Sequence, residues 1–342
     1  MSRPPRDLFE PVVDEGRLDP RFRAVMSERQ WAPARATMRE VFAGMGDRDG
    51  NFIQQFQTDG FDARVWELYL FAAFDAAGLD VRMEDERPDF LLAGRDREWA
   101  VEATTANPSG NRPPPAAATD PQERLAYMDG ELAVRLGGAL VSKLSKRYWE
   151  LPHVAGKPFV LAIQSFASED SLTFADTTLV EHLYGLRTYA ERDEAGELHV
   201  YNAPIASHRG SKTISSGFFA LPDAEHVSAV LWSNSGTVPK FARMGFQDGV
   251  DSAGLRMIRA GTRHVMDPNA SEPARFLYEV GSRRETWPEG LTMAHNPRAL
   301  HPLTRDAFPG IAHHAIEHGL VTSWLPPFQP YRSETVILVV GD

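Results

Sequence analysis

The sequence of 342 residues contains no cysteine. This absence excludes disulfide bonds and thiolate metal sites, so any bound metal must be held by carboxylates, histidines or backbone oxygens. Such ligands favour hard cations, Mg²⁺ or Mn²⁺. The sequence also lacks an apolar run long enough to span a bilayer, and its first residues show no apolar segment typical of a secretory signal. We therefore expect a cytoplasmic protein without a membrane partner.

Basic residues are outnumbered, with 36 Lys and Arg against 47 Asp and Glu, which gives a formal net charge of −11. This balance argues against broad, non-specific wrapping of nucleic acid. It leaves room for a local basic groove, because an acidic metal site and an acidic outer surface add to the same sum. A hydrophobic content of 42% with 24% charged residues is typical of a globular protein with one large or two ordinary domains.

Hydrophobic periodicity divides the chain into three regions. Residues 1–60 are rich in Pro, Arg and Gly and are predicted to form an N-terminal helical and irregular leader. Residues 61–170 follow the order helix, strand, strand, strand, helix, strand, which predicts an α/β core with a mixed sheet flanked by helices. The predicted elements of this core are a helix from residue 61 that ends at Gly78, strands at 79–83, 89–93 and 98–104, a helix over 121–150 and a buried strand at 158–163.

The remaining residues, 171–342, predict a β-rich C-terminal region packed on the core. A helix is expected at 176–190, and strand-like runs occupy 198–203, 213–219, 227–232, 276–280, 291–295 and 335–340. The sequence leaves open whether these strands extend the first sheet or form an abutting subdomain.

Three carboxylates stand out in the predicted core. Glu67 lies on its first helix, Asp89 opens one strand, and Glu102 interrupts the apolar run of the next strand. Burying an unpaired carboxylate costs several kcal/mol, so Glu102 needs a partner. If the three side chains converge at one end of the sheet, their oxygens can bind Mg²⁺ or Mn²⁺.

The same residues resemble a known signature. Pro88-Asp89, a gap and Glu102-Ala103-Thr104 at the end of a strand resemble the motif of the PD-(D/E)XK nuclease superfamily, which includes restriction endonuclease-like and Mrr-like enzymes. The resemblance covers roughly residues 60–166. It implies a restriction endonuclease-like core and an Mg²⁺-dependent nuclease acting on nucleic acid, with DNA favoured over RNA. It also implies Asp89 and Glu102 as metal ligands, the carbonyl of Ala103 as a third ligand and Glu67 as an auxiliary ligand through water.

One position departs from this motif, because Thr104 stands where the family has a lysine. In the family that lysine orients the attacking water or stabilises developing charge, and a threonine offers no cation. Lys143 and Lys146 on the following predicted helix are the available substitutes. The alternative is a nuclease-like module that has lost activity and binds nucleic acid or a protein partner; self-association into an oligomer is compatible with either interpretation.

Each of these residues also has an ordinary structural interpretation. Glu67 could be an exposed helix residue, Asp89 could cap a turn after Pro88, and Lys143 with Lys146 could form a solvated basic face. Gln164 in the buried strand could point into the same site or be a satisfied core amide.

Two further patterns suggest other chemistry. His314-Ala315-Ile316-Glu317-His318 resembles the H-x-x-E-H motif of inverted zincin metallopeptidases, in which a helix brings both histidines to one zinc ion and the glutamate acts as base. We favour a surface helix for this segment. The polar residues 232–237, followed by Lys240 and Arg243, could contact phosphates, although an ordinary strand-to-helix connection is favoured.

Overall fold

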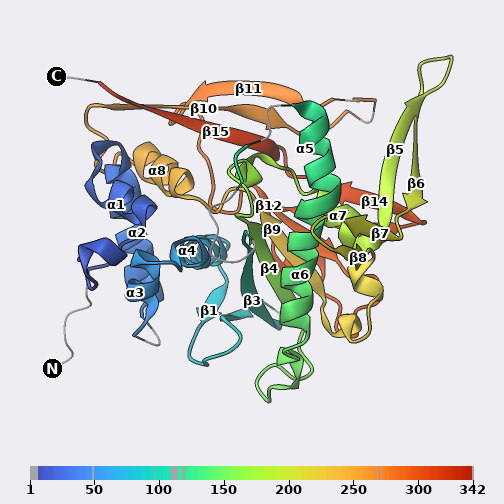
Figure 1. Ribbon diagram of the computed structural model, residues 1–342, viewed down its shortest axis with the longest axis horizontal. Helices are drawn as coiled ribbons and strands as arrows, with labels where there is room; N and C mark the ends of the chain where they lie inside the picture. The colour runs from blue at the N-terminus through green and yellow to red at the C-terminus, as the bar shows by residue number, and fades with distance from the viewer. Residues whose placement is uncertain are drawn as a thin grey trace.

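The computed structural model describes residues 7–47, 50–95, 97–108, 115–117, 120–267, 269–270 and 272–340. It is a mixed α/β structure built on an eight-stranded sheet with helices on both faces (Figure 1). The strands of this sheet, in spatial order, are β1 (Asp80–Arg82), β2 (Phe90–Ala93), β3 (Glu98–Ala106), β4 (Phe159–Ser165), β9 (Ala229–Ser233), β12 (Leu291–His295), β13 (Ala312–Glu317) and β14 (Leu320–Trp324).

Strand directions in the sheet are mixed. β1, β2 and β3 form an antiparallel meander, whereas β3, β4 and β9 run parallel to one another. β12 is antiparallel to β9 and parallel to β13, and β14 returns antiparallel at the edge. All seven residues of β4 are buried, as expected for a central strand covered on both faces.

The two faces of β3 are covered by different helices. Val101 and Ala103 belong to the core cluster that contains the apolar residues of α4 (Phe61–Ala76), whereas Ala100 and Ala106 belong to the cluster of α6 (Ala133–Leu144). Because side chains alternate along a strand, Glu102 and Thr104 project toward the α6 face. Figure 1 shows α4 and α6 on opposite sides of the sheet.

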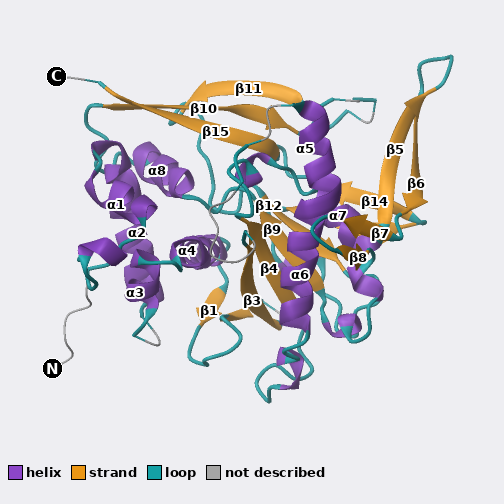
Figure 2. Ribbon diagram, viewed as in Figure 1, coloured by secondary structure: helices purple, strands orange, loops and turns teal. Residues whose placement is uncertain are grey.

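The described part of the leader is mainly helical. It contains α1 (Pro20–Ser27), α2 (Ala32–Met45) and α3 (Phe52–Gln57), in agreement with the helical leader expected there. Phe9 stacks on Phe22, Phe56 meets both rings edge-on, and all three join the same core as α4. These helices gather beside α4 and α8 (Val238–Gln247), away from α6 (Figure 2).

The segment predicted as one helix over 121–150 is a column of two helices. α5 (Pro121–Tyr127) is capped by Asp120, whose carboxylate accepts hydrogen bonds from the amides of Gln122 and Glu123. A π-helical turn at Met128–Leu132 joins it to α6, and the chain leaves α6 through a 3₁₀ turn at Tyr148–Glu150. The column crosses from β3 to β4.

The C-terminal half both extends the sheet and forms smaller sheets. β9, β12, β13 and β14 continue the large sheet beyond residue 170, so this boundary does not mark a sheet edge. β10 (Leu255–Arg263), β11 (Ala274–Glu279) and β15 (Pro330–Val339) form a separate three-stranded sheet. The hairpin of β5 (Leu186–Arg192) and β6 (Leu198–Pro204) protrudes from the body, beside the short hairpin of β7 (Ser207–Arg209) and β8 (Thr213–Ser215) (Figure 1).

The helix predicted at 176–190 is shorter than expected. α7 (Thr177–Tyr184) ends at Gly185, which adopts a positive φ of 70°, and the chain continues as β5. Across the residues that the structure describes, no helix is both long and apolar enough to cross a membrane.

Candidate functional site

Asp89 and Glu102 are brought together by the hairpin of β2 and β3. Asp89 lies immediately before β2, and Phe90 pairs with Val101 on β3. The Oδ2 atom of Asp89 accepts a hydrogen bond of 2.8 Å from the backbone N–H of Ala103. This bond fixes the Asp89 carboxylate beside the residue that follows Glu102.

Lys143 reaches the same place from α6. Its Nζ atom donates a hydrogen bond to Oε1 of Glu102, and the two side chains are 27% and 5% exposed, respectively. The second oxygen of Glu102, Oε2, is buried and forms no hydrogen bond of normal geometry with a described residue. The site therefore combines a buried strand carboxylate, a neighbouring carboxylate and a partly accessible ammonium group.

The charges of this site are unequally matched. Burial raises the pKa of Glu102, and repulsion from Asp89 raises it further, against the opposing effect of Lys143. Burial alone would lower the pKa of Lys143, but attraction to Glu102 and Asp89 outweighs it and raises that pKa. Burial is the largest single effect on both pKa values, and in addition two carboxylates share one ammonium group.

Tyr148 is a site residue that the sequence did not single out. It lies in the 3₁₀ turn after α6 and is buried, and its hydroxyl interacts with Glu102; burial and this carboxylate raise the pKa of the hydroxyl. Tyr148 follows Lys143 by five positions in a segment predicted to be helical, where it is indistinguishable from a core aromatic residue. The 3₁₀ turn, which the chain enters through Arg147 at a φ of 52°, places Tyr148 beside Glu102 on β3.

The other residues expected at the site lie in different surroundings. Glu67, on α4, forms an ion pair of 2.5 Å with Arg64 one turn earlier. Thr104 is half-buried on the α6 face of β3, and Lys146 is exposed beyond the end of α6. Within the described ranges, no group of three or more His, Asp and Glu side chains is spaced to hold a metal ion, so the predicted three-carboxylate cluster with Glu67 is not formed.

Gln164 and the segment after β9 have structural roles. Gln164 donates to the carbonyl of Gly236 at 2.8 Å and accepts from its N–H at 3.0 Å, as a satisfied core amide does. Lys240 and Arg243 are 0% and 3% exposed and both bind Glu285. They are therefore unavailable to phosphates.

The H-x-x-E-H segment is not the surface helix that we expected. His314 and Glu317 lie on strand β13, and His318 follows in a turn with a φ of 52°. Four residues of extended chain span roughly 13 Å, so the strand separates the two histidines instead of stacking them. His314 is buried between Ser323 Oγ at 2.7 Å and Asp176 Oδ2 at 3.1 Å. The metallopeptidase interpretation depends on helical spacing of the two histidines, and this arrangement removes it because His314 lies on a strand and His318 in the turn that follows.

Comparison of the chain with known protein families, with curated proteins and with solved structures gives no significant match.

Proposed function

We propose that the protein is a metal-dependent nuclease of the PD-(D/E)XK type, whose site consists of Asp89, Glu102 and Lys143. The observation that carries the proposal is the contact between Lys143 and Glu102 beside Asp89. It offers a cation from α6 in place of the lysine that the motif lacks at Thr104. The order of α4, β1, β2, β3, α6 and β4 also agrees with the core that the resemblance implies.

The donor set suits a hard cation. Mg²⁺ is commonly held by one or two carboxylates while it keeps several waters, so Asp89 and Glu102 suffice, with the carbonyl of Ala103 as a further candidate. Oε2 of Glu102 is a buried oxygen without a well-formed hydrogen bond. Burial and repulsion from Asp89 raise the pKa of Glu102, and a divalent cation beside it would offset both effects. When bound, such an ion supplies an acidic water and positive charge beside a phosphoryl oxygen.

The chain's own residues then have distinct tasks. The raised pKa of Lys143 keeps its Nζ protonated at neutral pH, so this residue acts as a cation and not as a general base. Its side chain is partly exposed and can turn from Glu102 toward the charge that develops on a phosphate. The hydrogen bond from Ala103 keeps Asp89 oriented.

The experiment that tests this function is Mg²⁺- and Mn²⁺-dependent degradation of a panel of single- and double-stranded DNA and RNA. Asp89→Asn and Glu102→Gln should each lower cleavage by about 100-fold or more while the proteins remain folded. Lys146→Gln is the matched control, because it removes an exposed cation beyond α6 and should retain most activity.

A second candidate, a non-catalytic module that binds nucleic acid or a protein partner, is favoured by one observation. Glu102 already has Lys143 as a partner, and this pair can hold β3 to α6 without a metal. Absence of cleavage of every substrate, together with absence of Mg²⁺ and Mn²⁺ binding by calorimetry, would reject the nuclease and favour the module.

A further inference from the structure

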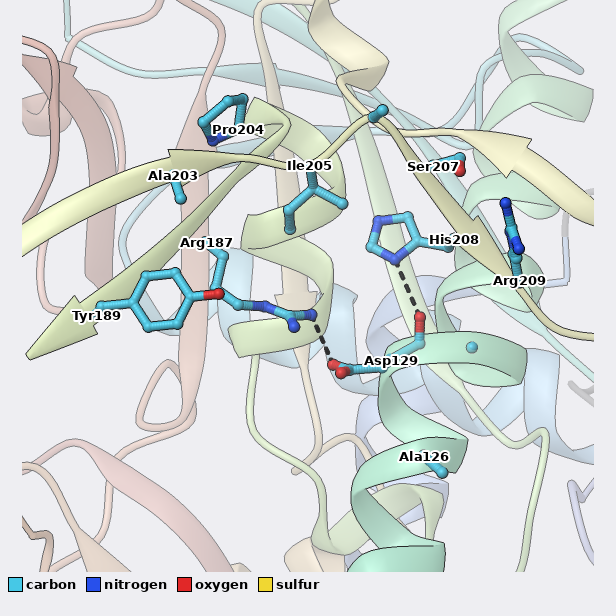
Figure 3. Close-up of a pocket in the computed structure, with 12 residues that line it drawn as sticks. Ala126, Asp129, Arg187, Tyr189, Ala203, Pro204, Ile205, Ser207, His208 and Arg209 are labelled. Carbon is cyan, nitrogen blue, oxygen red and sulfur yellow. Dashed lines mark hydrogen bonds and ion pairs between the residues drawn. The ribbon is translucent and has the colours of Figure 1, made fainter.

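Two cavities lie along the helical column on the N-terminal side of Lys143. The nearer cavity, of about 270 Å³, is lined by the end of β3, by Gly138 and its neighbours on α6, and by Lys212 from the β7–β8 turn. The farther cavity, of about 470 Å³, lies between Gly130 on the column and the β5–β6 and β7–β8 hairpins (Figure 3). At 1.5 Å per helical residue, roughly 20 Å of column separates Lys143 from Gly130. The β7–β8 hairpin borders both cavities, the farther one through β7 and the nearer one through Lys212 of its turn.

This turn is held tightly on the column. A Cβ atom at Gly130 would lie 2.5 Å from the carbonyl oxygen of Arg209, so only glycine allows this close approach. On the other side of the turn, the N–H of Ser211 donates to Oε2 of Glu131 at 2.5 Å. The positions of Arg209 and Lys212 are therefore fixed relative to α6.

Arg209 and Lys212 differ from their basic neighbours. Arg135 is paired with Glu131, and Arg187 is paired with Asp129 and Glu181. Arg209 and Lys212 are exposed, and neither side chain forms an ion pair or a hydrogen bond with any residue of the described ranges. Exposed cations without acidic partners can contact phosphates without first breaking an ion pair within the protein.

An aromatic side chain lines the farther cavity. Tyr189 projects from β5 on the side of the cavity opposite Arg209 (Figure 3). It is 41% exposed, and one face of its ring stacks on Tyr201 at a centroid distance of 5.4 Å and an interplanar angle of 17°. Bases of any sequence can stack on such a ring, because every base has a π-face.

We propose that the candidate site and these two cavities form one track that binds a single strand of nucleic acid. Lys212 and Arg209 contact phosphates upstream or downstream of the site, and a base stacks on Tyr189. The inference rests on the proposed function and specifies its substrate class. A single strand is selected over a duplex because an unpaired base exposes its ring faces, and because two free cations do not neutralise a wide duplex surface.

The track ends at Tyr189. Farther along the protruding hairpin stand Glu191, Asp193 and Glu194, whose charges repel phosphates. Tyr201 donates its hydroxyl to Glu191 at 2.6 Å, so its polar edge is already occupied. A bound strand therefore passes Tyr189 and leaves the protein before the tip of the hairpin.

The test is the affinity of the full-length protein for a fluorescein-labelled oligothymidylate of about 12 nucleotides, measured by anisotropy in EDTA so that metal-dependent cleavage does not interfere. A duplex of the same length is the competitor. Tyr189→Ala should weaken single-strand binding by about 5-fold or more, whereas Tyr189→Phe should stay within about 2-fold. Lys212→Gln and Arg209→Gln should each reduce the slope of log K against log salt by about 0.7. Arg23→Gln on α1 removes an equal charge far from the track and should have no effect.

The outcomes separate this inference from the proposed function. Equal affinity for single strand and duplex, or equal loss in Tyr189→Ala and Tyr189→Phe, would overturn the track. The track would be overturned, and the nuclease retained, if cleavage depends on Asp89 and Glu102 while the affinity for the strand does not depend on Tyr189, Arg209 or Lys212. Strand binding that depends on these three residues without any cleavage would support the track and reject hydrolysis.

Discussion

Glu102 and Glu285 are both buried glutamates that contact a lysine, yet their surroundings differ. Glu285 accepts hydrogen bonds from Lys240 at 2.6 Å and from Arg243 at 2.8 Å, and Arg259 lies 3.3 Å away. Glu102 has one ammonium partner, Lys143, and shares it with Asp89. The first glutamate has an excess of cationic partners and the second has too few.

The difference shows in the pKa values. Burial alone would raise the pKa of Glu285, but its three cations hold it well below the ordinary value. Burial, only partly offset by Glu285, lowers the pKa of Lys240 to about 8. The pKa of Glu102 is raised instead. Burial of a carboxylate is therefore not by itself a sign of a functional site. A buried carboxylate with too few cationic partners is a better candidate, because an additional cation would stabilise its charge.

The largest expected effect tests the contribution of Glu285 and its three cations to the stability of the fold. Glu285→Gln leaves three cations buried without their shared anion and should lower the free energy of unfolding by about 3–5 kcal/mol. Urea denaturation followed by circular dichroism measures it. Glu279→Gln is the matched control, because Glu279 pairs with Arg256 on the exposed side of the three-stranded sheet, where water screens the pair, and its loss should be far smaller than that of Glu285→Gln. A loss below about 1 kcal/mol for Glu285→Gln would contradict a structural role of the cluster.

The next effect tests whether Lys143 replaces the lysine missing at Thr104. Lys143→Ala should lower Mg²⁺-dependent cleavage by about 100-fold. Thr104 lies two residues beyond Glu102 on the same face of β3, so Thr104→Lys in the Lys143→Ala background returns a cation to the site. We expect it to restore activity by about tenfold, that is, about 1.4 kcal/mol of transition-state stabilisation. Absence of recovery in a folded double variant would show that Lys143 acts through position-specific packing and not through its charge.

Much of the fold could be predicted from sequence because hydrophobic period and turn residues act locally. The helix from Phe61 and the strands at 89–93, 98–104 and 158–163 coincide with α4, β2, β3 and β4, and β12 was placed at its observed residues, 291–295. The alternation along β3 also put Glu102 in an apolar environment. These features depend on neighbouring residues alone.

Features that depend on distant residues were missed. β13 carries polar histidines, whose burial requires Ser323 and Asp176 from other elements, so its sequence favoured a surface helix. β10 contains Arg259, which is fully buried only because Glu289 and Glu285 neutralise it. For the site, the sequence identified Asp89, Glu102 and Lys143 as candidates, but their contact depends on the angle at which α6 crosses β3. Tyr148 was missed for the same reason.

A smaller effect is expected for the stability of Glu102→Gln. The substitution removes the repulsion from Asp89 and leaves Lys143, which is partly exposed, able to reach water or Asp89. The free energy of unfolding should therefore change by less than about 1 kcal/mol, in contrast to Glu285→Gln. Parallel urea titrations of the two variants measure the contrast. Comparable losses in both would remove the distinction between an under-compensated and a fully compensated glutamate.

The smallest expected effect is the pH dependence of two stability differences, that between wild type and Glu102→Gln and that between wild type and Glu285→Gln. The pKa values of the two glutamates are shifted in opposite directions, so the two differences should respond differently to pH. Glu285 has a lowered pKa in the folded state, so its stabilisation is complete above its unfolded value of 4.5 and is lost as the pH falls through the folded pKa. Glu102 has a raised pKa, so its ionised form destabilises the folded state above that pKa, and this cost disappears as the pH falls. As the pH falls through the raised pKa of Glu102 toward the ordinary value of 4.5, the wild-type protein should therefore gain stability relative to Glu102→Gln. The advantage of the wild-type protein over Glu285→Gln should persist over that range and decline only at lower pH. A constant difference between wild type and Glu102→Gln would mean that Glu102 does not titrate above its ordinary range, and that its charge is already balanced within the fold.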